Sequence, residues 1–86
     1  MLKDNVVAIT GGAGLIGTAF SKAIIKNRGK VIIGDVSITK GISLQNELGI
    51  ENALFVEVNT SDTDSIDKFL KTGKDYFGKI DSAIHC

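Results

Sequence analysis

The chain has 86 residues, of which 43% are hydrophobic and 23% charged, and its ten acidic residues balance ten basic ones. These values fit a single globular domain and argue against a disordered chain, a broadly basic nucleic-acid-binding surface and a basic helix on a membrane. The single cysteine excludes an internal disulfide framework, and no apolar run approaches the roughly 18 residues that cross a membrane.

Short apolar runs alternate with longer amphipathic ones along the chain. Continuous, mostly β-branched runs are typical of strands buried on both faces, and apolar residues at helical spacing predict helices between them. The strands are predicted at residues 6–9, 31–35, 53–58 and 80–85. The helices are predicted at about residues 15–28, 37–48 and 61–77, each followed by a glycine. Gly41 weakens the second helix, because an interior glycine costs about 1 kcal/mol relative to alanine. Ser61 or Asp62 is expected to cap the third helix.

The order βαβαβαβ predicts a parallel sheet with right-handed crossovers and helices on both faces. We expect a Rossmann-type, doubly wound α/β fold with strand order 3-2-1-4, the N-terminal half of such a sheet. The fourth strand would leave a bare edge where a fifth strand normally pairs. Residues 1–86 are therefore expected to form a partial dinucleotide-binding domain of a longer protein, truncated at the end of that strand.

A glycine-rich turn lies between the first predicted strand and the first predicted helix. Gly11, Gly14 and Gly17 have the spacing G-x-x-G-x-x-G, which in this context indicates a dinucleotide-binding loop. Gly11 would allow the sharp turn, Gly14 the close approach of a pyrophosphate, and Gly17 the close packing of the helix on the sheet. The N–H groups of the first helical turn, at Leu15 and Ile16, would face the phosphates. The alternative is a flexible turn without a ligand, and a nucleoside-triphosphate loop is disfavoured because the Gly-Lys-Ser/Thr ending is missing.

Asp35 follows the second predicted strand at the usual distance, about 20 residues, from the glycine turn. Its carboxylate can accept hydrogen bonds from both hydroxyls of an adenosine ribose and would repel a 2′-phosphate. Residues 10–17 contain no Arg or Lys, and the nearest base after Asp35 is Lys40. NAD is therefore predicted in preference to NADP. The alternative is that Asp35 caps the helix that begins near Ser37.

Residues 10–17, T-G-G-A-G-L-I-G, closely resemble the cofactor loop of the short-chain dehydrogenase/reductase superfamily. Asp35 matches the acidic residue of this family after the second strand. Residues 76–81, Y-F-G-K-I-D, are similar to the family's Phe-Gly-x-Ile/Leu-Asp stretch before the fourth strand. The resemblance covers nearly the whole chain. The candidate cofactor-binding residues are Gly11, Gly14, Leu15, Ile16, Gly17, Asp35, Val36, Asn59 and Thr60.

The subfamily signals are mixed. The T-G-x-x-G-x-x-G form is similar to the extended members, which include nucleotide-sugar epimerases and dehydratases, and Ile84-His85 resembles their Ile-His at the end of the fourth strand. Compact members usually have glycine where Leu15 stands. They also usually have Asn-Asn-Ala-Gly after the fourth strand, and His85-Cys86 would occupy the two Asn positions of that motif. Residues 77–81, F-G-K-I-D, and the helix before them look like the compact branch, which is slightly favoured.

Many family members place Asp after the third strand to hydrogen-bond the adenine amino group, whereas this chain has Asn59. The amide oxygen of Asn59 could accept the same bond, and its NH₂ group could reach a ring nitrogen. Alternatively, Asn59 or Thr60 starts the turn and caps the third helix.

The catalytic Tyr-x-x-x-Lys pair of the family has no counterpart here. Tyr76 is the only tyrosine, and Ile80 stands four residues after it, so no catalytic residue is assigned. No metal site is expected, because the only histidine, His85, lacks accompanying ligands at a suitable spacing. His85 is expected to line the cofactor cleft or to fill a strand-end position. Cys86 has no activating partner except His85, which would point to the opposite face of the strand.

The resemblance implies that the intact protein is an NAD-dependent short-chain oxidoreductase that interconverts an alcohol and a ketone. This chain would supply the half of the site that binds adenosine and pyrophosphate, and on its own it would bind NAD weakly or not at all. The alternatives are an extended-type nucleotide-sugar epimerase or dehydratase and a non-catalytic dinucleotide-binding protein. A small-molecule substrate and homo-oligomers of the intact protein are expected, without nucleic-acid or membrane partners. Residues 1–5, M-L-K-D-N, lack the apolar region of a signal peptide, so the expected location is the cytoplasm.

Overall fold

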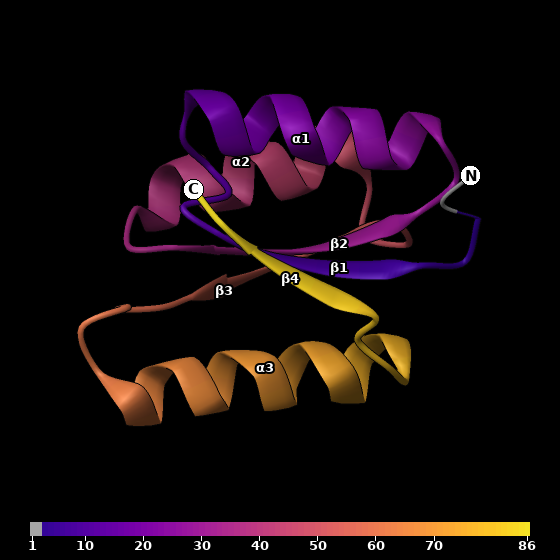
Figure 1. The fold of residues 1–86 in the computed structure, drawn as a ribbon. Helices are drawn as coiled ribbons and strands as arrows, with labels where there is room; N and C mark the ends of the chain where they lie inside the picture. Colours follow the sequence, from indigo (N-terminus) through magenta and orange to yellow (C-terminus); the bar gives the residue numbers. More distant parts are fainter. Residues whose placement is uncertain (1–2) are drawn as a thin grey trace.

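The computed structural model describes residues 3–86, in which strands and helices alternate (Figure 1). The strands are β1 (Val6–Thr10), β2 (Lys30–Asp35), β3 (Ala53–Glu57) and β4 (Ser82–His85). The helices are α1 (Leu15–Lys26), α2 (Ile38–Leu48) and α3 (Thr63–Phe77). Met1 and Leu2, which begin the segment without signal-peptide character, lie outside the described residues.

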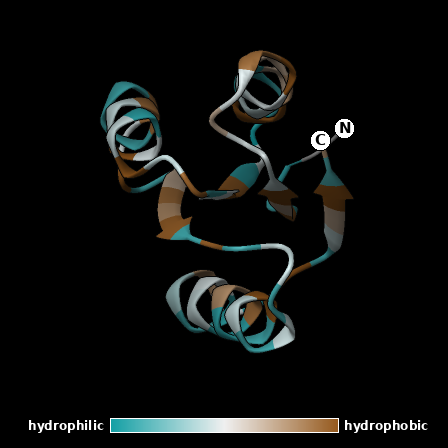
Figure 2. Cartoon of the chain, turned by 90° about the vertical axis from the view of Figure 1, so that its left-hand side faces the viewer, coloured by the Kyte–Doolittle hydropathy of each residue, from teal (hydrophilic) through white to brown (hydrophobic). Residues whose placement is uncertain are grey.

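The strands pair in parallel in the order β3-β2-β1-β4, which confirms the predicted doubly wound α/β fold. Helices α1 and α2 cover one face of the sheet and α3 covers the other (Figures 1 and 2). The register brings the carboxyl ends of the strands together, because Thr10 of β1 pairs with Gly34 of β2 and with His85 of β4. The glycine turn, Asp35 and His85 therefore meet at one edge of the sheet.

Two apolar clusters hold the layers together, one on each face of the sheet. Ile9 and Ile33 pack toward α1 and α2, whereas Ile32 packs toward α3 and the ring of Phe69. These aliphatic side chains are completely buried, and each contributes about 1.5–3 kcal/mol by leaving water. Burial on both faces explains why the strand sequences are continuously apolar. Among residues 3–86, no helix combines the length and hydrophobicity that crossing a membrane requires.

Gly41 allows α2 to lie close to β3. A Cβ at this position would overlap the aromatic ring of Phe55. The helix begins after Ser37, whose Oγ accepts a hydrogen bond from the Lys40 N–H at 3.3 Å, and it ends at Gly49, where φ is 93°. The packing against Phe55 offsets the low helix propensity of glycine, so the helix forms at its predicted position.

We expect Gly41→Ala to destabilise the chain by about 1–3 kcal/mol, because the added methyl group would overpack the contact with Phe55. In an exposed helix the same change stabilises by about 1 kcal/mol, so the sign of the effect is diagnostic. Urea denaturation measures it. The double variant Gly41→Ala/Phe55→Leu should lose less stability than the sum of its two single variants, and a more stable Gly41→Ala chain would contradict this account.

Helix α1 ends earlier than the sequence predicts. Asn27 terminates it by donating a side-chain hydrogen bond to the Ala23 carbonyl at 2.8 Å. The left-handed backbone conformation follows at Arg28, where φ is 68°, and not at Gly29. In contrast, Asp62 caps α3 and Gly78 closes it with φ at 88°, as predicted.

Asp81, the residue before β4, connects that strand to the start of β1. Its Oδ2 accepts a hydrogen bond from the Val6 N–H at 2.8 Å and lies 3.1 Å from Lys79 Nζ. The backbone hydrogen bond from Val6, followed by the contacts with Lys79, lowers the pKa of Asp81 below its ordinary value. The ionised carboxylate is therefore the form that the fold favours.

A carboxyl group with a lowered pKa in the folded state stabilises the fold above its unfolded pKa, about 3.9, and this contribution is lost as the pH falls through the lower folded value. We therefore expect Asp81→Asn to be less stable than the wild type at pH 7, with the difference shrinking below about pH 4. Urea denaturation across this range is the measurement. A difference that stays constant with pH would show that Asp81 acts without its charge.

Candidate functional site

A hollow of about 140 Å³ lies beside the glycine turn at the carboxyl ends of the strands. It is lined by Gly11, Asp35, Val36, Val58, Thr60, His85 and Cys86. Helices α1 and α3 leave this edge toward opposite faces of the sheet (Figure 1). In open parallel sheets, ligands bind outside the carboxyl ends of the strands, where the direction of the crossovers reverses. The hollow is therefore where the fold predicts a ligand.

Gly11 and Gly17 are required by the fold itself. Gly11 has φ at 70°, which disfavours a side chain, and a Cβ there would lie 2.6 Å from the carbonyl oxygen of Cys86. A Cβ on Gly17 would overlap the Gly11 carbonyl oxygen and the Gly12 backbone. The sharp turn at Gly11 is as predicted. The close contact at Gly17 joins α1 to the loop backbone, whereas the sequence predicts a contact with the sheet.

Gly14 has a different environment. Its backbone, with φ at −75° and ψ at −179°, suits any residue, and the nearest atom to an added Cβ would be the Gly11 oxygen at 3.4 Å. Neither strain nor packing within the described chain therefore requires glycine at this position. No side chain among residues 3–86 caps α1, and its first turn has no acidic residue. The unpaired N–H groups and the positive end of the helix dipole thus remain open to an anion.

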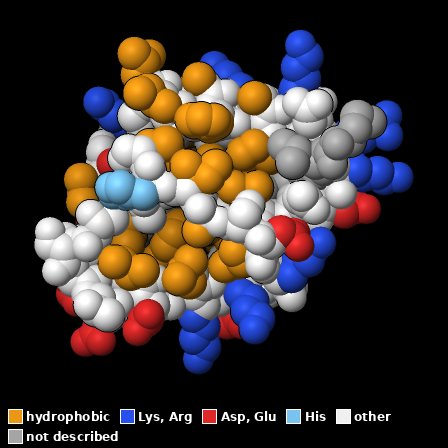
Figure 3. All heavy atoms as spheres, in the orientation of Figure 1, with side chains coloured by type: hydrophobic (Ala, Val, Ile, Leu, Met, Phe, Trp, Pro, Cys, Tyr) orange, Lys and Arg blue, Asp and Glu red, His pale blue; other side chains and the backbone are white. Residues whose placement is uncertain are grey.

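The side chains of Leu15 and Ile16 do not face the hollow or the core. Leu15 is 91% exposed and Ile16 64% exposed, so only their backbone N–H groups could serve a phosphate. They continue into an apolar stripe with Ala19, Phe20 and Ala23 along the outer surface of α1, which Figure 3 shows as gathered hydrophobic side chains. The buried residues of α1 are instead Gly17, Ser21 and Ile24.

Asp35 connects β2 to the glycine turn. Its Oδ2 accepts a hydrogen bond from the Ala13 N–H at 3.1 Å, and its Oδ1 accepts one from the Ser37 N–H at 3.0 Å. Because a carboxylate offers about four acceptor positions, one position remains on each oxygen. The helix cap of α2 is Ser37, so the interpretation of Asp35 as that cap is wrong.

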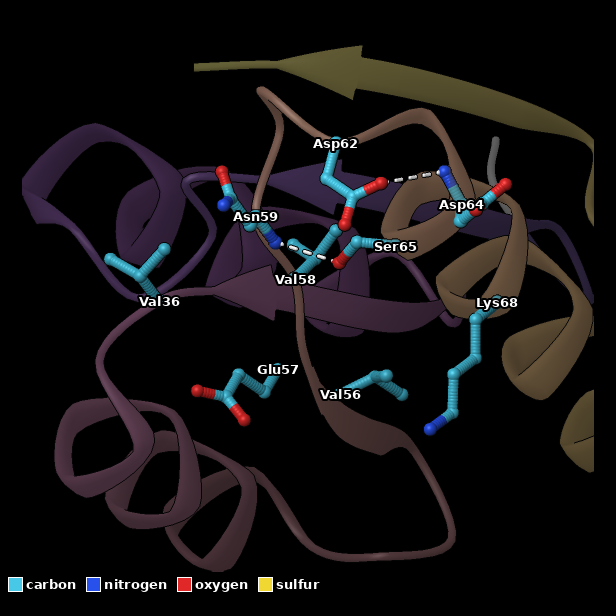
Figure 4. Close-up of a pocket in the computed structure, with 9 residues that line it drawn as sticks. All are labelled: Val36, Val56, Glu57, Val58, Asn59, Asp62, Asp64, Ser65 and Lys68. Atoms are coloured by element: carbon cyan, nitrogen blue, oxygen red, sulfur yellow. Dashed lines mark hydrogen bonds between the residues drawn. The ribbon is translucent and has the colours of Figure 1, made fainter.

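A second, larger cavity of about 480 Å³ lies between the end of β3 and the start of α3 (Figure 4). It is lined by Val36, Val56, Glu57, Val58, Asn59, Asp62, Asp64, Ser65 and Lys68. Figure 4 shows Val36 and Asn59 at one end and Lys68 at the other. Val36 and Val58 line both cavities, so the two spaces adjoin. Val36 is 68% exposed there, which leaves an aliphatic surface between the polar walls.

Asn59 starts the turn between β3 and α3. Its N–H donates to Ser65 Oγ at 2.9 Å, and its Oδ1 accepts from the Ser61 N–H at 3.0 Å. Asp62 caps the helix by accepting from the Asp64 N–H at 3.0 Å. The alternative interpretation is thus correct in that Asn59 starts the turn, through its N–H and its Oδ1, and wrong in that Asp62, not Asn59 or Thr60, caps α3. Its Nδ2 group and a second acceptor position on Oδ1 take no part in these bonds.

The β1–β4 contact adds residues that the candidate set omits. Thr10 Oγ1 lies 2.7 Å from Nδ1 of His85, and His85, Cys86 and Val58 line the hollow. His85 thus lies at the end of β4, which is one of the two predicted positions, and lines the hollow. Among residues 3–86, no group of three or more His, Cys, Asp or Glu side chains is placed to hold a metal ion.

Tyr76 lies away from the candidate site. Its hydroxyl donates to the carbonyl of Ile50 at 2.7 Å, in the turn before β3, and its ring packs edge-on against Phe77. These contacts are at the opposite edge of the sheet from the hollow. Tyr76 therefore packs, half-exposed, against Phe77 and the turn before β3, and it does not line the hollow.

Comparison with known proteins agrees with this geometry. The family model described as short chain dehydrogenase matches residues 5–86. The 3-hydroxyacyl-CoA dehydrogenase type-2 of Drosophila melanogaster is 34% identical over 86 residues, covering 100% of this chain and 33% of that protein. Short chain aldehyde dehydrogenase 1 of Euphorbia lathyris is 33% identical over 81 residues, covering 93% of this chain and 28% of that protein.

Solved structures give the same result. The 3-ketoacyl-(acyl-carrier-protein) reductase from Brucella melitensis complexed with NADH superposes with a TM-score of 0.92 at 28% sequence identity, covering 96% of this chain and 34% of that one. The chain thus spans about one third of the length of the relatives that it matches. Because the family model matches nearly all of the sequence, the chain belongs to the short-chain dehydrogenase/reductase family of oxidoreductases.

Proposed function

We propose that this chain binds the adenosine and pyrophosphate half of NAD, as the N-terminal part of the cofactor domain of a short-chain oxidoreductase that interconverts an alcohol and a ketone. The observation that carries the proposal is that Gly14 and Asp35 occur together beside the glycine turn. Gly14 leaves the start of α1 open although nothing within the described chain requires glycine there. Asp35 keeps one acceptor position on each carboxylate oxygen at the adjoining hollow.

Each part of the dinucleotide has a matching surface. The N–H groups of Leu15 and Ile16 would hold the diphosphate, and the carboxylate of Asp35 would accept hydrogen bonds from the ribose hydroxyls. The adenine ring would lie on the exposed aliphatic side chain of Val36, with Asn59 at its edge. Gly11 and Gly17 would shape the loop, and Thr60 would line the ribose side. When bound, the nicotinamide supplies hydride transfer, whereas these residues only position the cofactor.

The proposal favours NAD over NADP. A 2′-phosphate would place a charge of about −1.5 to −2 beside the Asp35 carboxylate. No Lys or Arg is among the residues that line the hollow, so no fixed cation would compensate. The similar reductase from Brucella melitensis was crystallised with NADH, which agrees with this preference.

The remaining features of the intact protein are proposals that rest on the family. We place the substrate site and a Tyr-x-x-x-Lys pair in the part that corresponds to the other two thirds of its relatives. The intact protein would be a cytoplasmic homo-oligomer acting on a small molecule.

NMR titration of the chain with ADP-ribose, which retains the adenosine, both phosphates and the second ribose, tests the proposal. We expect weak, saturable binding, with shifts at the amides of Gly14, Leu15 and Asp35. The amides of Gly49 and Asn52, at the opposite edge of the sheet, serve as internal controls and should not move. Absence of saturable shifts at the glycine turn would overturn the proposal.

A further inference from the structure

His85 is the residue that can bring positive charge to the hollow beside the glycine turn. Among the residues that line the hollow, all of them described by the structure, it alone can become a cation. It is exposed (Figure 3), so water can deliver and remove its proton without a change in the fold. Histidine ordinarily changes charge between pH 5 and 8.

Thr10 can hydrogen-bond the imidazole ring in both of its charge states. The distance of 2.7 Å between Thr10 Oγ1 and His85 Nδ1 is that of a hydrogen bond. In the neutral ring, the Thr10 hydroxyl can donate to Nδ1. In the charged ring, Nδ1 carries a proton and donates to the same oxygen. For the neutral tautomer that carries its proton on Nε2, protonation reverses this hydrogen bond without requiring the ring to move, and Nε2 remains a free donor on the charged ring.

The charges around His85 favour an anionic ligand only when the ring is protonated. Strand β2 contributes the carboxylate of Asp35, and β4 is followed by the thiol of Cys86. Strand β1 contributes the uncharged Thr10, and the segment after β3 contributes Thr60 and Val58. A diphosphate would add two negative charges beside Asp35. Residues 10–17 supply no Lys or Arg to balance them.

We propose that protonated His85 contacts the diphosphate of the bound dinucleotide, so that dinucleotide binding takes up a proton. This inference rests on the function proposed above and adds a binding residue to that site. The bound diphosphate would favour the protonated form of His85. Because linkage is reciprocal, protonation of His85 would favour binding of the diphosphate by the same factor, so the affinity for the dinucleotide must rise as the pH falls. Two unit charges about 4 Å apart near water interact strongly enough to change affinity by roughly five- to tenfold.

The test is the affinity of ADP-ribose between pH 8 and pH 5.5, measured by NMR titration of the intact chain. Both phosphates of this probe are esterified, whereas the terminal phosphate of ADP would itself titrate near pH 6. His85→Asn retains a group that can hydrogen-bond Thr10 and removes the charge. His85→Arg makes the charge permanent. Adenosine, which lacks phosphates, is the ligand control.

We expect wild-type affinity for ADP-ribose to rise by roughly five- to tenfold on acidification. The affinity of His85→Asn should stay low at both pH values, and that of His85→Arg should stay high. Adenosine affinity should not change with pH. If ADP-ribose binds equally at both pH values, or if His85→Asn keeps the wild-type slope, His85 does not supply the charge although the proposed function stands. If the affinity for adenosine depends on pH to the same extent, the diphosphate is not the group that His85 contacts. If ADP-ribose does not bind at any pH, both proposals fail.

Discussion

Gly17→Ala is expected to destabilise the chain by about 3 kcal/mol, the upper end of the usual range for overpacking. The new methyl group would overlap the carbonyl oxygen of Gly11 and the backbone of Gly12. Backbone atoms cannot rotate away as a flexible side chain can, so α1 must move off the glycine turn. A domain of this size has roughly 4–13 kcal/mol of total stability, and urea denaturation followed by circular dichroism should resolve the loss.

Gly14→Ala is the matched control for this prediction. Its methyl group would meet nothing closer than 3.4 Å within the chain, so the loss of stability should not exceed about 1 kcal/mol, the scale of a helix-cap change. However, the methyl group would stand at the open start of α1 and should lower ADP-ribose affinity by about tenfold or more, the equivalent of 1.4 kcal/mol. Similar losses of stability in both variants, or unchanged ADP-ribose affinity in Gly14→Ala, would contradict the assigned roles.

Asp35→Asn is expected to remove the preference for a ligand without a 2′-phosphate. In the wild type, the carboxylate would repel the charge of about −1.5 to −2 on that phosphate. The amide has no net charge and cannot accept from both ribose hydroxyls while also accepting from Ala13 and Ser37. We expect the ratio of affinities for ADP-ribose and its 2′-phosphorylated form to fall by about tenfold or more. Stability should fall by about 1 kcal/mol, because one of the two backbone bonds loses its acceptor.

Glu57→Gln provides the control for charge alone. Glu57 pairs with Asp35 in the β2–β3 register and lines the larger cavity, so its substitution removes one negative charge from the neighbouring strand. The affinity ratio should remain close to that of the wild type. An equal change of the ratio in both variants would mean that general electrostatics, and not the placement of Asp35, determines the preference.

The fold was largely predictable because its elements are encoded locally. Continuous, mostly β-branched apolar runs such as residues 31–33 are typical of strands in a sheet that is covered on both faces. The face of α1 that packs on the sheet was harder to predict from the sequence. Its exposed stripe of Leu15, Ile16 and Phe20 is at least as apolar as its buried face. The small residues Gly17 and Ser21 determine which face of α1 is buried, because they allow the helix to approach its neighbours closely. The spacing of hydrophobic residues does not reveal such a contact.

The candidate site shows the same division between local and distant signals. The glycine spacing and the position of Asp35 after β2 are local features, so the sequence places them correctly at one edge of the sheet. The contact between Thr10 and His85 joins residues 75 positions apart and depends on the β1–β4 register. The two hydrogen bonds of Asp35 were likewise hidden, because the path of the loop near Ala13 follows from tertiary packing.

A crystal structure of the chain with ADP-ribose tests the central claim most directly. We predict that diphosphate oxygens lie within hydrogen-bond distance of the Leu15 and Ile16 N–H groups, with both adenosine ribose hydroxyls donating to Asp35. A ligand bound elsewhere, or a ribose turned away from Asp35 with the start of α1 left open, would contradict the account.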